Sequence, residues 1–218
     1  MNGLPFFEYV NLFRDDLIFA TQKHLLVSLY TLLIATILGI GLGMLVYRSK
    51  TFSTASIGAL AIGFTIPSIA LFGLLVPILG TGLSVGFPVL TMYGLLPILR
   101  NTIVGLNSVD KATLDAARGI GMGRLRMLWQ IEIPLAWPVI LTGVRVAGQL
   151  IVGIVVIGAY VRVPGLGEPI FNALQNLGAV NTFNQALSAT ILVAVIALVL
   201  DATFVLVRRY STPRGIRV

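Results

Sequence analysis

Two ionisable side chains stand within long apolar stretches of this 218-residue chain. Arg145 interrupts the apolar run over residues 136–160, and Asp201 interrupts the run over residues 185–207. Charged groups at membrane depth are costly, and they pair with each other, face water or mark a transport pathway. We therefore expect Arg145 and Asp201 to form an ion pair or to line an aqueous pathway. The alternative is that each side chain reaches separately for water at the near end of its helix.

The residue types that enzymes use most are scarce. The chain has no cysteine and a single histidine, His24, so by itself it offers neither a thiolate nor a site of several histidines. No lysine follows a glycine, which excludes a phosphate loop of the Walker type. We predict no catalytic residues, no bound cofactor and no metal site. Any driven work must then draw on a partner or on an ion gradient.

The composition indicates an integral membrane protein. Hydrophobic residues make up 57% of the chain and charged residues 11%, and the mean hydropathy is +0.97. Soluble domains carry about 25% charged residues. The net charge of +7 would be compatible with nucleic-acid binding. The basic residues, however, gather between the apolar runs, which is typical of membrane topology, and we expect lipid and no nucleic acid as a partner.

Five membrane-spanning helices are predicted, because each apolar run can cross a hydrocarbon core of about 30 Å at 1.5 Å per residue. The spans cover residues 25–47, 56–79, 84–106, 136–160 and 185–207. Prolines within the second and third spans favour burial in a bundle, since lipid does not satisfy the backbone groups that proline frees. Residues 1–24 suit an interfacial helix or a frayed tail, and residues 208–218 form a basic tail.

The orientation follows from the distribution of basic residues. Eleven of the fifteen lysines and arginines lie in residues 48–55, 100–135 and 208–218. Basic loops stay preferentially in the cytoplasm. We therefore expect the N-terminus outside and the C-terminus in the cytoplasm.

The longest polar interruption, residues 107–135, is expected to form two short cytoplasmic helices. Asn107 or Ser108 can cap the first helix. Gly121 can adopt the left-handed conformation that ends a helix and turns the chain. The second helix should end at Pro134, which removes a hydrogen bond from a helix interior.

This segment resembles the cytoplasmic signature loop of ABC-importer permeases. That loop has an acidic-Ala-Ala start, a glycine four residues later and an apolar-x-apolar-Pro finish. The matching residues are Asp115, Ala116, Ala117, Gly121, Ile131, Ile133 and Pro134. Asp115 stands where the family has glutamate, which keeps the charge. The resemblance implies that the loop docks on an ATPase subunit, which binds ATP and magnesium in place of this chain; an ordinary amphipathic connector is the alternative.

Further short motifs resemble the permeases of the osmoprotectant group, which import glycine betaine, carnitine, choline or proline. They are Thr65-Ile66-Pro67-Ser68, the run from Leu95 to Thr102, Gly143-Val144-Arg145, Gly158-Ala159-Tyr160 and Pro164-Gly165-Leu166-Gly167. The segment from Val161 to Pro164 departs from the small, glycine-rich pattern of the family. The resemblance implies an all-α protein with the type I ABC-importer permease fold in a bacterial or archaeal cell membrane. It also implies a second permease, identical or paralogous, two ATPase subunits and an extracytoplasmic solute-binding protein.

Other functions remain open from the residues themselves. Tyr93 and Tyr160 are candidates to line a pathway, because aromatic rings attract quaternary ammonium groups, although tyrosines in spans more often pack. A methionine-type amino-acid importer permease is the alternative within the class. An ATP-independent channel or carrier would need carboxylates at the midplane, and Asp201 alone could serve. An assembly subunit would tolerate changes at Asp115 and Gly121.

Overall fold

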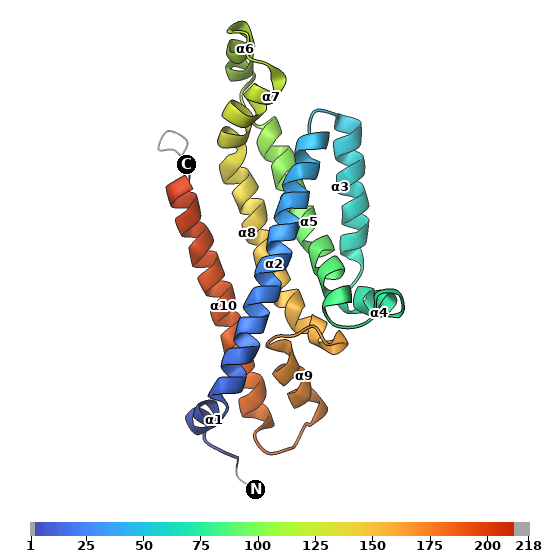
Figure 1. Ribbon diagram of the computed structural model, residues 1–218, viewed down its shortest axis with the longest axis vertical. Coiled ribbons are helices and arrows are strands. Elements are labelled where there is room, and N and C mark those ends of the chain that lie inside the picture. The colour runs from blue at the N-terminus through green and yellow to red at the C-terminus, as the bar shows by residue number, and fades with distance from the viewer. Residues whose placement is uncertain (1–2, 212–218) are drawn as a thin grey trace.

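The computed structural model describes residues 3–211, and all regular secondary structure in that range is helical. The elements are α1 (Phe6–Leu12), α2 (Arg14–Val46), α3 (Lys50–Thr65), α4 (Ser68–Leu79), α5 (Leu83–Asn107), α6 (Lys111–Gly119), α7 (Arg124–Met127), a π turn (Leu128–Glu132), α8 (Ile133–Gly158), a 3-10 turn (Ala159–Val161), α9 (Gly167–Gln175) and α10 (Thr182–Ser211). The helices α2, α5, α8 and α10 run along the long axis of the molecule (Figure 1). The short helix α6 lies at one end of this axis, and α1 and α9 lie at the other.

Within residues 3–211, four helical segments are long and apolar enough to cross a membrane: α2, α5, α10 and the continuous stretch Arg124–Val161. The helices α3 and α4 form a further apolar segment, bent by 93°. The expected second span, residues 56–79, is therefore not one straight helix. Pro67 forces the bend, because the preceding Ile66 takes the extended conformation that residues before proline prefer (φ −71°, ψ 127°).

The centre of the bundle is α5, which packs against α2, α3, α4 and α8. The approach of α2 to α5 is close, because two glycines of α2 face it. A Cβ on Gly39 would lie 2.7 Å from the Ile98 side chain, and one on Gly43 would lie 2.5 Å from Thr102. Small residues at such positions let membrane helices pack backbone to backbone.

The loop between α8 and α9 is fastened to α2 by His24, which is fully buried. The backbone N–H of Leu166 donates to His24 Nδ1 over 3.3 Å, and His24 Nε2 lies 3.1 Å from the carbonyl oxygen of Val152. Since Nδ1 accepts a hydrogen bond, the proton of the neutral ring is on Nε2, which donates to Val152. His24 thus connects α2, α8 and the loop before α9.

The N-terminal residues in the described range are ordered against α10. The backbone N–H of Leu4 donates to Asn181 Oδ1 over 2.7 Å, and Asn184 Nδ2 donates to the carbonyl oxygen of Leu4 over 2.7 Å. The helix α2 already begins at Arg14, so residues 3–24 comprise α1 and the first turns of α2. At 33 residues, α2 is roughly 50 Å long at 1.5 Å per residue and extends beyond a hydrocarbon core.

The segment 107–135 differs from the expectation at both ends. Asp110 caps α6, because its Oδ2 accepts from the N–H of Thr113 over 3.3 Å, whereas Ser108 donates its hydroxyl to Gly105 at the end of α5. Pro134 does not end the second helix. The preceding π turn moves the hydrogen bonds to a five-residue spacing, with Ile133 N–H bonded to Leu128, and the helix continues into α8.

The C-terminal helix α10 is the most peripheral of the long helices, and its buried residues are Ser188, Ala189 and Ile196. It packs along α8 and α9, as Figure 1 shows. The basic tail expected over residues 208–218 lies partly outside the described residues, which end at Ser211.

Candidate functional site

The loop with the signature pattern projects beyond the ends of α5 and α8 (Figure 1). Within α6, Asp115 and Ala116 are exposed and Ala117 is buried. Arg118 Nη1 lies 2.8 Å from Asp115 Oδ1 in an exposed ion pair. The acidic and small residues of α6 therefore form an outward surface with little attachment to the bundle.

Gly121 turns the chain between α6 and α7. Its φ of +81° lies in the left-handed region, and nothing lies within 4 Å of the position that a Cβ would take. The glycine is thus required by backbone conformation and not by space. The N–H of Gly121 donates to Arg118 and that of Met122 to Ala117, so the turn satisfies two carbonyl groups at the end of α6.

Large apolar side chains lie exposed beside this turn: Ile120, Leu125 and Trp129. Ile131 is half-buried and Pro134 is exposed. Exposed apolar side chains grouped among charged ones are typical of a protein–protein contact. The loop has the chemistry of a docking surface, with an acidic and small-residue helix flanked by apolar groups.

Behind the loop lies a buried charge that sequence reasoning did not single out. Glu132 is 2% exposed and both its carboxylate oxygens are bonded. Tyr47 donates its hydroxyl to Oε2 over 2.5 Å, and Arg48 Nη2 donates to Oε1 over 3.0 Å. Arg48 Nε also donates to the Tyr47 hydroxyl over 2.6 Å. We call these three residues the Glu132 cluster.

Within the Glu132 cluster, Tyr47 donates to Glu132 and accepts from Arg48. Burial, and then the hydrogen bond and charge of Glu132, raise the pKa of Tyr47 to about 12. The phenol therefore remains a hydrogen-bond donor at physiological pH. A sequence signal existed, since Glu132 is the acidic residue between two apolar ones before Pro134 and Arg48 is a lone arginine after a long apolar run. Their separation of 84 residues left them unconnected.

The structure brings Arg145 of α8 and Asp201 of α10 together. Arg145 Nε donates to Asp201 Oδ1 and Nη2 donates to Oδ2, both over 2.6 Å, and Gln149 Nε2 also donates to Oδ1 over 2.6 Å. The two-pronged contact matches the planar guanidinium to the planar carboxylate. The side chains stay 37% and 27% exposed in the single chain, so this pair fastens α10 to α8 at the protein surface.

The two tyrosines lie in different surroundings. Tyr93 is buried, donates its hydroxyl to the carbonyl oxygen of Ile66 and packs against Phe64. It therefore supports the bend between α3 and α4 and faces the interior, not an open pathway, in this conformation. Tyr160 is exposed, with its ring 6.2 Å from that of Phe171.

Comparison with known proteins identifies the family. A family model described as "Binding-protein-dependent transport system inner membrane component" matches residues 35–214. This chain belongs to that family. It is therefore an inner-membrane component of a transport system, and the resemblance found from the sequence motifs is confirmed.

Curated relatives cover nearly all of this transport component. The osmoprotectant import permease protein OsmW of Salmonella typhimurium is 36% identical over 203 residues, which are 90% of this chain and 92% of that protein. The glycine betaine/carnitine/choline transport system permease protein OpuCB of Bacillus subtilis is 33% identical over 217 residues, which are 100% of this chain and 97% of that protein.

A solved structure shares the fold. A chain from the inward-facing MetNI methionine ABC transporter superposes with a TM-score of 0.79 at 18% identity, over 90% of this chain and 96% of that chain. At this identity the likeness concerns the fold alone. The transport component thus has the helical fold of an ABC-importer permease.

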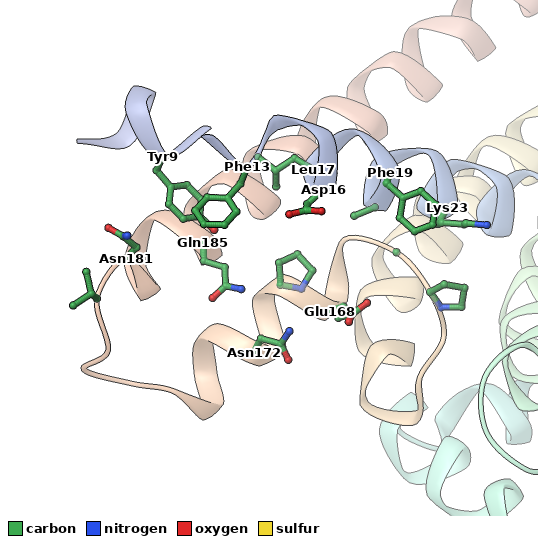
Figure 2. Close-up of a pocket in the computed structure, with 15 residues that line it drawn as sticks. Tyr9, Phe13, Asp16, Leu17, Phe19, Lys23, Glu168, Asn172, Asn181 and Gln185 are labelled. Carbon is green, nitrogen blue, oxygen red and sulfur yellow. The ribbon is translucent and has the colours of Figure 1, made fainter. Parts of the chain in front are cut away.

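A cavity of about 550 Å³ lies at the end of the transport component opposite α6, between α1, the start of α2, α9 and the start of α10. Figure 2 shows Asp16 and Glu168 on facing walls, with the rings of Tyr9 and Phe13 at one side and Lys23 at the other. Burial, and secondarily the charge of Asp16, raise the pKa of Tyr9. The cavity is aromatic and carries charges of both signs.

Within residues 3–211, no three histidine, cysteine, aspartate or glutamate side chains come together in a way that could hold a metal ion.

Proposed function

We propose that this transport component is the membrane-spanning permease subunit of an ATP-driven importer. The observation that carries the proposal is the projecting loop α6–α7, which presents Asp115 and Ala116 beyond the bundle. Its sequence matches the signature pattern of such permeases, and its family serves binding-protein-dependent transport. The sequence lacks a phosphate loop, so ATP hydrolysis would belong to a partner subunit.

In this proposal α6 docks into a groove of the ATPase subunit, with the loop Asp115–Pro134 in the cytoplasm and α1 and α9 outside. Two permeases pair around a central pathway, two ATPase subunits bind below, and a solute-binding protein delivers the solute from outside. Closure of the ATPase dimer moves both copies of α6 and turns the pathway outward. Such rigid-body movement about interfaces is an established kind of switching.

The proposed solute is a small compatible solute that carries a quaternary ammonium group. The support comes from the relatives, whose names specify osmoprotectants or glycine betaine, carnitine and choline, over nearly the whole chain. The methionine transporter is similar at 18% identity and bears on the fold only. The amino-acid alternative therefore has no comparable support.

Partner binding tests the coupling surface. Tagged protein purified from its own membranes in gentle detergent should carry an ATPase subunit, and Asp115→Lys should release it by reversing the charge of the docking helix. Asp15→Lys is the matched control, because Asp15 is also exposed beside an arginine but belongs to the start of α2, at the opposite end of the molecule from α6. Equal ATPase recovery with both variants would contradict docking through α6.

Transport tests the function. Proteoliposomes that contain the permease, its ATPase and its binding protein should take up labelled glycine betaine, carnitine or choline only with ATP, and methionine should not compete. Uptake without ATP or ATPase would instead establish a channel or carrier.

A further inference from the structure

The carboxylate of Glu132 is positioned too deep to meet an ATPase subunit. Its residue is 2% exposed, and both oxygens are already bonded to Tyr47 and Arg48. It also lies on the path between the docking helix and the membrane helices, as the last residue of the π turn that leads from α7 into α8. Its function in the importer must therefore be internal.

The Glu132 cluster joins segments that are distant in sequence. Tyr47 and Arg48 form the turn between α2 and α3, 85 and 84 residues before Glu132. The chain connects the projecting α6 to the bundle through only two places, the turn after α5 and the π turn before α8. Any displacement of α6 and α7 must pass through them, and the cluster ties the second one to α2 and α3.

The π turn by itself is suited to absorb such a displacement. Its hydrogen bonds have a five-residue spacing, and Pro134, two residues after its end, lacks an N–H. π turns inside α-helices occur frequently at functional sites. The contact of Glu132 with Tyr47 and Arg48 would prevent the π turn from bending, so that α7 and α8 keep one relative orientation.

We propose that Glu132 is a positioning residue that clamps the docking loop to the turn between α2 and α3. Through it, movement of α6 and α7 shifts α8, α2 and α3 as one body instead of bending the π turn. This inference rests on the proposed function and adds the route by which the docking helix acts on the membrane helices.

The surroundings support a geometric role. The Tyr47 ring packs in an apolar cluster with Leu99, Ile103 and Ile140, where an apolar side chain could replace the carboxylate without an unpaired charge. Buried ion pairs are often no more stabilising than well-packed apolar groups, while they can specify one arrangement. The short contacts of Glu132 fix the α2–α3 turn in one position against the π turn.

The test separates clamping from folding. Glu132→Gln keeps the shape and one acceptor for Tyr47 but removes the charge that holds Arg48. Arg48 is 42% exposed along its side chain and can turn to water, so this variant should fold. In proteoliposomes we expect solute uptake per ATP hydrolysed to fall at least roughly fivefold, the lower end of typical coupling between sites, while ATPase binding and ATP hydrolysis persist.

The double variant Arg48→Gln, Glu132→Gln removes both charges. The thermal stability of this double variant should equal or exceed that of Glu132→Gln. Its uptake per ATP should nevertheless remain low, because no ionic contact crosses the turn. Recovery of coupling together with stability would show a merely structural role and overturn the inference, as would unchanged coupling in Glu132→Gln. Arg14→Gln, at the exposed opposite end, is the control. Absence of ATP-driven uptake in the unaltered protein would instead refute the proposed function itself.

Discussion

At the residue scale, the contact between Arg145 and Asp201 predicts how charge-removing variants of the two residues change thermal stability. Asp201→Asn should lower the thermal stability of the detergent-solubilised protein, because the guanidinium loses its carboxylate at the contact between α8 and α10, two helices long and apolar enough to cross a membrane. Arg145→Gln combined with it should recover much of the loss, since neither charge then remains. Thermal unfolding of the four proteins of the double-mutant cycle measures this. Additive losses would exclude the pair as an energetic unit.

The sequence predicted the interaction partners of some residues and not of others. Arg145 and Asp201 could be paired because charges are so scarce in the spans that each had few possible partners. Glu132 and His24 were not connected to their partners, because those partners lie far along the chain: Tyr47 and Arg48 for Glu132, and the backbone of Val152 and Leu166 for His24. For Tyr93 the sequence left packing and pathway lining open, because it does not show on which side of α5 the hydroxyl finds its acceptor, the carbonyl oxygen of Ile66.

At the element scale, Gly121 governs where α6 points. Gly121→Ala should destabilise the turn by about 1–2 kcal/mol, the cost of a left-handed conformation for a residue with a side chain, and Gly121→Val should cost more. ATPase recovery in detergent should fall in that order. Gly119→Ala is the control, because Gly119 is helical and a Cβ there would meet nothing within 4 Å. An equal loss with Gly119→Ala would contradict a backbone-conformation effect.

Prolines explain why the elements were harder to predict than the spans. The predicted apolar runs fall within α2, α5 and α10 apart from Tyr47, because length and hydropathy are local properties, but α2 begins at Arg14, well before its apolar run. Pro67 and Pro134 both interrupt helices, yet the first produces a 93° bend and the second only a π turn. The difference depends on packing: the Tyr93 hydroxyl donates to the carbonyl oxygen of Ile66 at the bend, and the Glu132 cluster supports the π turn.

At the scale of the whole molecule, the absence of cysteine permits a direct test of orientation. Ile120, between α6 and α7, and Leu177, between α9 and α10, are 79% and 77% exposed and lie toward opposite ends of the long axis, so each position suits a single cysteine. In spheroplasts or protoplasts, whose plasma membrane is intact, a membrane-impermeant maleimide should label Leu177→Cys and not Ile120→Cys. Inside-out vesicles should give the reverse, and the unaltered chain is the blank. Labelling of both from one side would refute the proposed topology.

The hydrogen bonds by which His24 connects α2 to α8 and to the loop before α9 have a consequence for biogenesis. A ribosome delivers His24 to the membrane long before Val152 and Leu166, which are 128 and 142 residues further along the chain. During that interval the His24 imidazole has neither of these partners, and α2 lacks the helices that bury one of its faces in the finished bundle. We expect chains truncated before Val152 to be degraded quickly, and the arrival of α8 to be the moment when the first helix becomes protected.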